Sequence, residues 1–412
     1  MEPATEIILR HGLLLTLPIL CALILRGARL PGWPVLGGLM AGILLGPTFL
    51  GGVSPNTYEQ LFEGAVQQRI ARDGLAIALS DPKLPPETRP QLQAALIDAE
   101  ELWEDARWVD QRPLRCHTGT VVALTLLGAG WLAVRRNGRR PGLAVPASVG
   151  VWSAALPGAL AFVAMTRWWG FTTAQGAVAA AAVAIGPWTL TRIDREAADA
   201  AELGGARMVQ TAGRMASVIA LPAALWGMWQ QRGGEVLIWA APLCAIILAW
   251  LIPPPRLPGP APEKKTPDPF FPEKGSGVFF AREVLGVVAV PGLAACAAVK
   301  VDLFGDFAIW PVIVLLLLSG DARWLGAYAG AMLPGGRRWL RTMRLVMGSM
   351  ACGPTQLAIA AIAVHTRTIP DVIPLALLLG AAYIEISVPL RRHMSRRLME
   401  TEEEIANISD DT

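Results

Sequence analysis

The chain has 412 residues, of which 53% are hydrophobic and 17% are charged, and its mean hydropathy is +0.43. Soluble domains carry about a quarter charged residues, so this composition excludes an ordinary soluble globular protein. The net charge of +3 is small, and the basic residues gather beside apolar segments, so nothing indicates nucleic-acid binding. We also find no HExxH, Walker or GxSxG pattern, and we expect the protein not to be an enzyme.

Apolar runs near the ~20 residues that cross a bilayer recur along the whole chain, which predicts an all-α, polytopic membrane protein. The N-terminal run lacks the basic region and cleavage site of a signal peptide, so we expect it to be retained. Eleven spans are predicted: 7–26, 34–52, 117–134, 142–166, 173–190, 208–230, 235–252, 279–299, 305–334, 341–363 and 370–390.

The run 305–334 is long for one helix, because thirty residues rise ~45 Å against a ~30 Å core. Short cytoplasmic loops are rich in Lys and Arg, and this rule decides between one helix and two. If 305–334 is one helix, all basic loops fall on the same side of the membrane. If it is two helices, the basic loops are divided between the two sides. We therefore expect eleven spans in the cell (inner) membrane, with the N-terminus outside and the C-terminus in the cytoplasm. The basic loops contain Arg26 and Arg29, residues 135–140, Arg192, Arg195 and Arg207, residues 263–265, residues 335–341 and residues 391–397.

Two polar segments interrupt the spans. Segment 53–116 has two stretches with helical spacing of apolar residues, separated by "SDPKLPP", which predicts a helical hairpin outside the membrane. Segment 253–278 is a cytoplasmic linker, in which nine of the 20 residues from 253 to 272 are proline. The expected units are therefore 1–52 (two spans), 53–116 (hairpin), 117–252 and 279–392 (the two membrane halves), 253–278 (linker) and 393–412 (cytoplasmic tail).

A Gly-Pro pair interrupts one span in each membrane half: Gly186-Pro187 in "AAVAIGPWTLTRI" and Gly353-Pro354 in "GSMACGPTQLAIAA". The expected topology runs these two spans in opposite directions, as an inverted-repeat carrier with two crossing, broken helices would. Freed backbone groups are tolerated in a membrane where they line a polar cavity, so the breaks predict a midplane binding site. The alternative is that Gly and Pro are simply common in membrane helices. Candidate ligands close to the breaks are Thr189, Thr191, Thr355 and Gln356.

The stretch "RLPGWPVLGGLMAGILLGPTFLGGVSP" (29–55), with its "AGILLGP" string, resembles the first helices of Kef-type members of the monovalent cation:proton antiporter superfamily. The resemblance continues through the first broken span and from about 279 to 392, where "LGAYAGAML" lies. It implies exchange of a monovalent cation (Na⁺ or K⁺) for protons, two unwound crossing helices, and a second domain that often forms a homodimer.

The sequence departs from this family where the chemistry lies. The family places an acidic residue in the helix after the first break, but here that helix, 207–231, holds Arg214 and no Asp or Glu. An arginine stays protonated and cannot exchange a proton. If Arg214 faces the crossing point, it would repel a cation at 4 Å and an effective dielectric of ~20 by about 4 kcal/mol, close to a thousandfold in affinity. The alternative is that Arg214 lies near the cytoplasmic surface with Arg207.

The other intramembrane charges have simpler interpretations. Glu385 is the weak candidate for a coupling acid, although pairing with Arg391 or Arg392 near the inner surface explains it as well. Lys300 is expected to reach the outer interface. Asp321 and Arg323 are expected to neutralise each other at a bend.

Three functions stay open: a cation:proton antiporter; an antiporter-fold protein without proton coupling, which carries an anion or is inactive; and a sensor or anchor that binds a partner protein through 53–116. The five Cys and four His are scattered, so we expect no cofactor and no metal site. The bilayer is the expected environment in all three cases.

Overall fold

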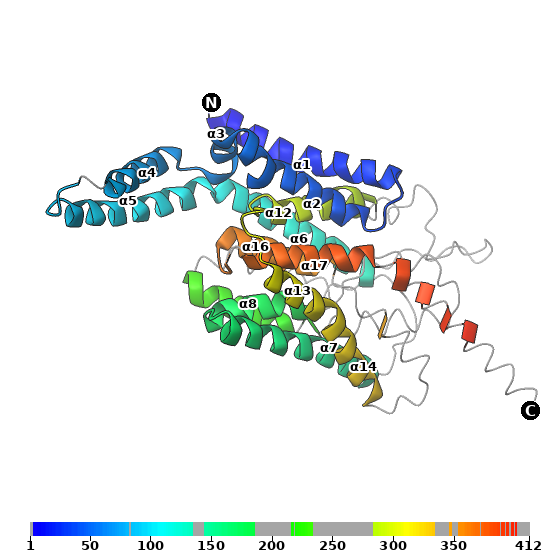
Figure 1. The fold of residues 1–412 in the computed structure, drawn as a ribbon. Helices are drawn as coiled ribbons and strands as arrows, with labels where there is room; N and C mark the ends of the chain where they lie inside the picture. Colours follow the sequence, from blue (N-terminus) through cyan, green and yellow to red (C-terminus); the bar gives the residue numbers. More distant parts are fainter. Residues whose placement is uncertain are drawn as a thin grey trace, which may run out of the picture.

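The computed structural model describes residues 3–81, 84–134, 144–185, 216–217, 219–233, 283–333, 346–347, 353–370, 372–387 and 389–391, with a few positions of the C-terminal tail. Throughout these residues the regular elements are helices and no strand occurs. Most of the helices run roughly along one direction (Figure 1), as expected for a membrane bundle.

Five of the described helices are long and apolar enough to cross a membrane: Thr5–Gly27, Trp33–Gly51, Ala147–Trp168, Ile309–Met332 and Val372–Arg391. Three shorter apolar helices accompany them: Thr173–Ala184, Leu285–Ala298 and Thr355–Thr366. The count of eleven spans stays a prediction, because span 235–252 lies outside the described residues and span 208–230 is described only in part.

Three helices pack tightly on one side of the bundle: α1 (Pro3–Gly27), α2 (Trp33–Leu45) and α12 (Val290–Ala298). Glycines of α2 make this contact close, since a Cβ on Gly38 would clash with the carbonyl oxygen of Pro291. Small residues allow backbones to approach in this way in membrane helices. The "LGGLMAG" pattern is therefore explained by helix packing.

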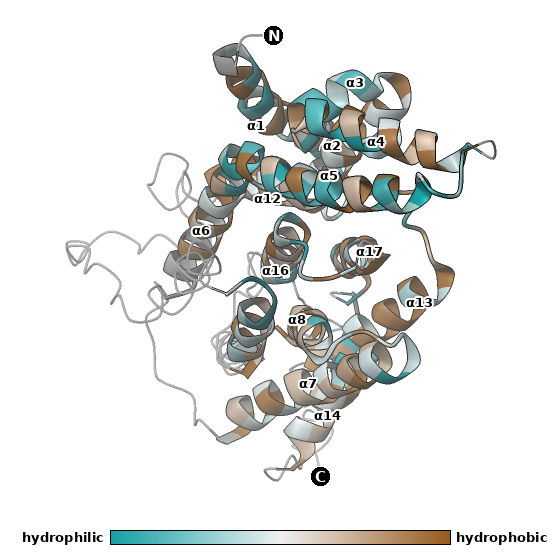
Figure 2. Cartoon of the chain, turned by 90° about the vertical axis from the view of Figure 1, so that its left-hand side faces the viewer, coloured by the Kyte–Doolittle hydropathy of each residue, from teal (hydrophilic) through white to brown (hydrophobic). Residues whose placement is uncertain are grey.

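The other helices form the rest of the bundle. Viewed end-on (Figure 2), α16 (Gly353–Thr366) and α17 (Val372–Ile386) lie in the middle. On the far side from α1 and α2 lie α7 (Ala144–Val163), α8 (Thr173–Ala184), α13 (Ile309–Leu317) and α14 (Arg323–Met332). One cluster of buried apolar side chains runs through α2, α8, α12, α16 and α17 and joins the two sides.

The span predicted at 305–334 is a single helical segment, Ile309–Met332, in the structure. A π-helical turn at Leu318–Ala322 separates α13 from α14 within it. Such turns insert one extra residue into a helix and are frequent at functional sites. The turn includes Ser319 and Asp321, two of the polar residues of this span.

A helical hairpin projects from one end of the bundle (Figure 1). It consists of α4 (Val66–Ser80) and α5 (Arg89–Asp110), and α5 leads through Gln111 into α6 (Arg112–Val134). The first of the two helical stretches expected in this segment is interrupted: α3 (Pro55–Tyr58) and a π-helical turn precede Gly64, and α4 starts after Ala65. Both residues have positive φ (69° and 50°), and the side chain of Asp110 accepts a hydrogen bond from the Ala65 backbone N–H at 2.8 Å.

Candidate functional site

The helix α8 ends immediately before the first Gly-Pro pair. It begins with a capping box between Thr172 and Gln175, and after Ala184 the chain leaves helical geometry, since Ile185 has φ −59° and ψ 133°. Ten of its twelve residues are buried, so its C-terminal end lies inside the protein. Of the predicted site, Gly186, Pro187, Thr189, Thr191 and Arg214 lie outside the described residues.

A buried arginine from a distant span binds the end of α8. The side chain of Arg323 is fully buried, and its Nη2 donates a hydrogen bond to the carbonyl oxygen of Val183. The C-terminus of a helix carries a partial negative charge of about −0.5, so a cation there is stabilising. The expected neutralisation of Arg323 by Asp321 is wrong, because Asp321 lies on the exposed side of the same helix. Residues two positions apart do not face each other on a helix, so the two side chains point to different sides.

The second Gly-Pro pair stands at the start of α16, and the two residues that follow it are buried. Gln356 donates through Nε2 to the carbonyl oxygen of Leu377 at 3.3 Å and to Oγ of Ser319 at 3.5 Å. The lack of a side chain at Gly380 leaves room for Gln356 and Ser319. A Cβ added to Gly380 would lie 3.4 Å from Nε2 of Gln356 and 3.4 Å from Oγ of Ser319. Oε1 of Gln356 is buried and has no hydrogen-bond donor in the described part of the chain. An unsatisfied buried acceptor costs about 1–3 kcal/mol, which favours a solute or water at this position.

These side chains form what we call the deep polar cluster: Ser319, Arg323, Thr355 and Gln356, all fully buried. Gln356 contacts Ser319, Arg323 lies four residues further along the same span, and α8 packs against α16. Sequence reasoning predicted Thr355 and Gln356 but missed Ser319 and Arg323. A charged residue beside Gly320 in the middle of an apolar run was the available signal.

The chemistry of the deep polar cluster follows from its composition. It contains one fixed positive charge, an amide and two hydroxyl groups, and no carboxylate. Such groups bind an anion or a hydrogen-bonding neutral solute, but none of them releases a proton near neutral pH. Within the described residues, no group of three or more His, Cys, Asp or Glu could hold a metal ion.

Glu385, the predicted coupling acid, lies elsewhere. Glu385 is buried on α17 and packs against the turn between α1 and α2. A Cβ added to Gly32 in that turn would lie 2.8 Å from the Cβ of Glu385. Arg391 is buried at the same end and donates to the carbonyl oxygen of Ile384 at 2.7 Å. Arg392 lies outside the described residues. Glu385 is therefore placed at the end of the bundle opposite the hairpin and outside the deep polar cluster.

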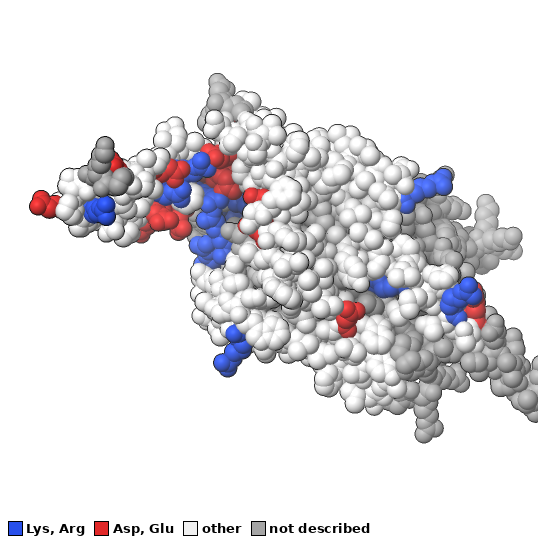
Figure 3. Space-filling model, in the orientation of Figure 1, with Lys and Arg blue, Asp and Glu red and all other residues white. Residues whose placement is uncertain are grey.

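A cavity of about 830 Å³ lies between the hairpin and the adjoining ends of the membrane helices. Figure 3 shows charged side chains gathered where the hairpin joins the bundle, while most of the remaining visible surface is uncharged. The cationic side chains that line the cavity are Arg69, Arg72, Arg107, Lys300 and Arg367, and the acidic ones are Glu59, Glu63, Asp302 and Asp306.

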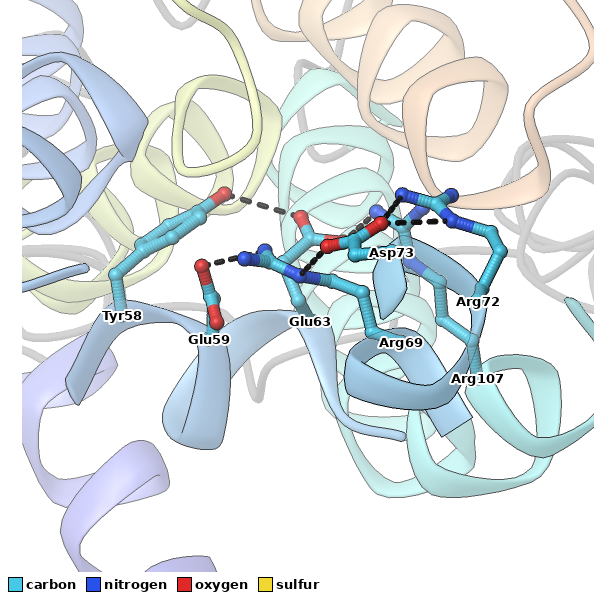
Figure 4. Close-up of polar contacts among 7 residues, drawn as sticks. All are labelled: Tyr58, Glu59, Glu63, Arg69, Arg72, Asp73 and Arg107. Carbon is cyan, nitrogen blue, oxygen red and sulfur yellow. Dashed lines mark hydrogen bonds and ion pairs between the residues drawn. The ribbon is translucent and has the colours of Figure 1, made fainter. Parts of the chain in front are cut away.

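Ion pairs organise the hairpin side of this cavity (Figure 4). Arg107 pairs with Glu63, Arg69 pairs with Glu59, and Arg72 contacts Asp73 at 2.5 Å. Lys300, expected at the outer interface, donates to Oε1 of Gln111 at 2.5 Å, at the junction of α5 and α6. The acidic groups and the arginines of the hairpin thus pair with each other, and the cavity is lined by charges of both signs.

No known protein-family model matches this chain, and no curated protein matches it either. The resemblance to Kef-type antiporters therefore stays a prediction.

Proposed function

We propose that the chain is a multi-pass membrane carrier whose solute site is the deep polar cluster, and that the solute is a small anion. The observation that carries the proposal is the buried guanidinium of Arg323 against the last turn of α8. A buried charge inside a membrane protein is costly and is by default a functional feature. Here the charge is a permanent cation at the end of a helix that stops within the core.

Three further observations support an anion over Na⁺ or K⁺. The first turn of α16 contributes the positive end of a helix dipole beside Thr355 and Gln356. The outer cavity has Lys300 and Arg367 in its lining. Among the described residues, the deep polar cluster has no carboxylate that could hold a proton and a cation in turn. Proton-coupled cation exchange is therefore the less favoured of the predicted functions.

The test is flux through the purified full-length chain in liposomes. We expect counterflow of radiolabelled sulfate, phosphate or succinate, and no cation-dependent proton movement after a pH jump with Na⁺, K⁺ or neither. The variant Arg323→Gln should lose at least tenfold of the anion flux, whereas Arg323→Lys, which keeps the charge, should lose less. Robust Na⁺- or K⁺-dependent proton flux would show a cation antiporter instead. Absence of flux for every solute would contradict the carrier.

A non-transporting sensor is the second candidate, and the junction of α5 with α6 favours it. Gln111, the residue between these helices, accepts from Lys300 and donates to the carbonyl oxygen of Glu63 at 2.8 Å. Gln111 thus joins the hairpin to the bundle, and we infer that this junction passes on a binding event at the hairpin. If removal of residues 67–106 leaves anion flux intact, the hairpin is not required for transport.

A further inference from the structure

The amide group of Gln356 is fixed in one orientation by its surroundings. The side chain is fully buried, and one end of the amide lies 3.3 Å from the main-chain carbonyl oxygen of Leu377 and 3.5 Å from Oγ of Ser319. A carbonyl oxygen only accepts hydrogen bonds, so the amide must turn its NH₂ group toward Leu377. Its own carbonyl oxygen, Oε1, then lies at the opposite end of the amide.

This oxygen is a hydrogen-bond acceptor that requires a donor. It is buried, and no donor reaches it from the part of the chain that the structure describes. A buried acceptor without a partner is destabilising, so it normally marks the position of a bound water or ligand. Because α16 lies in the middle of the bundle (Figure 2), the donor must be supplied deep inside the protein.

The other groups of the deep polar cluster are donors. Arg323 has a permanently charged guanidinium with several N–H groups, of which one on Nη2 donates to Val183. Ser319 accepts from Gln356 through Oγ and also has a hydroxyl proton to donate. The first turn of α16 adds backbone N–H groups and the positive end of a helix dipole. The cluster therefore combines several donors with one acceptor that faces away from the protein groups binding the same amide.

We propose that the deep polar cluster selects oxyanions that carry a proton, such as hydrogen phosphate or hydrogen carbonate, over oxyanions without one, such as sulfate or nitrate. This inference rests on the proposed function and narrows it to one class of anion. The unprotonated oxygens of the solute would accept from Arg323 and Ser319, and its O–H group would donate to Oε1 of Gln356. Sulfate would instead place an oxygen lone pair against Oε1, and a site built to bind a solute O–H group rejects an analogue that lacks it.

Other classes of solute match this arrangement less well. Ammonium would donate to Oε1 of Gln356, but the guanidinium of Arg323, four residues from Ser319 on the same span, would repel it. A halide ion only accepts hydrogen bonds, so it would meet the lone pairs of Oε1 as sulfate does. The arrangement therefore favours a solute that is both an anion and a hydrogen-bond donor.

Phosphate and sulfate are the matched pair for the test, because both are tetrahedral oxyanions of similar size and only phosphate keeps a proton at neutral pH. Counterflow of each labelled anion is measured with the full-length chain in liposomes, and phosphate should exchange at least tenfold faster than sulfate. Hydrogen carbonate and nitrate form the corresponding planar pair. The proton-bearing anion must be preferred by this factor in at least one pair, and equal rates within both pairs would overturn the proposal.

Substitution of the acceptor shows whether Gln356 is the group that distinguishes the anions. Gln356→Met removes the amide at similar volume and should bring the ratio of phosphate to sulfate flux close to one. Arg323→Lys should slow both anions and keep the ratio, because it changes the donor and not the acceptor. Gln231→Met is the matched control, since Gln231 bonds to Gly227 of its own helix, and it should leave both rates unchanged. A ratio that survives Gln356→Met would contradict the assignment to Oε1.

Binding in detergent tests the same selectivity without transport. Phosphate and sulfate both stabilise proteins in general, so the informative quantity is the difference between them at equal ionic strength. Phosphate should raise the midpoint of thermal unfolding more than sulfate, and Gln356→Met should abolish this difference. The difference without any flux would support the selective site and contradict the carrier, whereas equal flux of both anions would support the carrier and contradict the selectivity. No difference in binding or in flux, as expected if a resident water satisfies Oε1, would overturn the proposal.

Discussion

The amide of Gln356 donates to the main-chain carbonyl oxygen of Leu377, 3.3 Å away, and so joins α16 to α17 through a buried hydrogen bond. Because the Leu377 carbonyl lies in a helix, this is an additional bond to an oxygen that turns toward the deep polar cluster. The contact connects the second predicted break to the last span of the bundle.

We expect Gln356→Leu to lower the free energy of unfolding by about 1–3 kcal/mol, since it removes a buried donor from both Ser319 and Leu377. Thermal unfolding in detergent measures the loss. Gln231→Leu is the control, because Gln231 is half-buried and bonds only weakly, at 3.4 Å, to Gly227 of its own helix. Equal destabilisation by the two changes would contradict a special role for Gln356.

Asp321 is an exposed carboxyl group near the middle of the span Ile309–Met332. An acid at the centre of a membrane helix costs about 2.5–3.5 kcal/mol on insertion scales. We therefore expect Asp321→Leu to make insertion of this span more favourable by about that amount, measured by glycosylation mapping. Leu325→Asp, at an exposed apolar position of the same span, should shift insertion in the opposite direction. An unchanged insertion efficiency for Asp321→Leu would indicate that another group compensates the carboxylate.

Two glycines of the hairpin should respond oppositely to alanine. Gly64 has φ 69° and ψ −176°, a region open almost only to glycine, and a Cβ there would lie 2.6 Å from the Cβ of Asp110. Gly64→Ala should therefore destabilise the hairpin by about 1–3 kcal/mol. Gly74 is helical with open space around it, so Gly74→Ala should stabilise α4 by about 0.5–1 kcal/mol. Hydrogen–deuterium exchange of the α4 amides measures both, and protection that changes in the same direction would refute this prediction.

The membrane orientation is tested by labelling of single cysteines in intact cells. With Cys116→Ser as background, Ser80→Cys at the end of α4 should react with an impermeant maleimide. Lys264→Cys in the proline-rich linker should react only after permeabilisation. The reverse pattern would overturn the orientation with the N-terminus outside and with it the count of eleven spans.

Local patterns predicted some elements well and failed where distant contacts decide. The end of α8 next to Gly186-Pro187 follows from glycine and proline chemistry, which acts within a few residues. The break at Gly64 and Ala65 was missed because Ala65 adopts positive φ, where its N–H bonds to Asp110, 45 residues away. Arg323 and Val183 are separated by 140 residues, and no spacing rule relates them. Asp321 near Arg323 suggested a local ion pair, but residues two positions apart do not face each other on a helix, and here one side chain is exposed and the other buried.

The passage from α5 into α6 through Gln111 has a mechanical consequence. At ~1.5 Å per residue, the helical path from Arg89 to Val134 is about 70 Å long, and roughly half of it extends past the bundle. Hydrogen bonds to Lys300 and Glu63 fix Gln111, so a movement of α5 is expected to rotate α6 about this residue. A sideways pull at the free end then produces a torque on α6, where Thr125 touches the carbonyl oxygen of Ala289 at 3.3 Å. A partner bound at the hairpin would therefore affect the packing of α6, a helix that it does not contact.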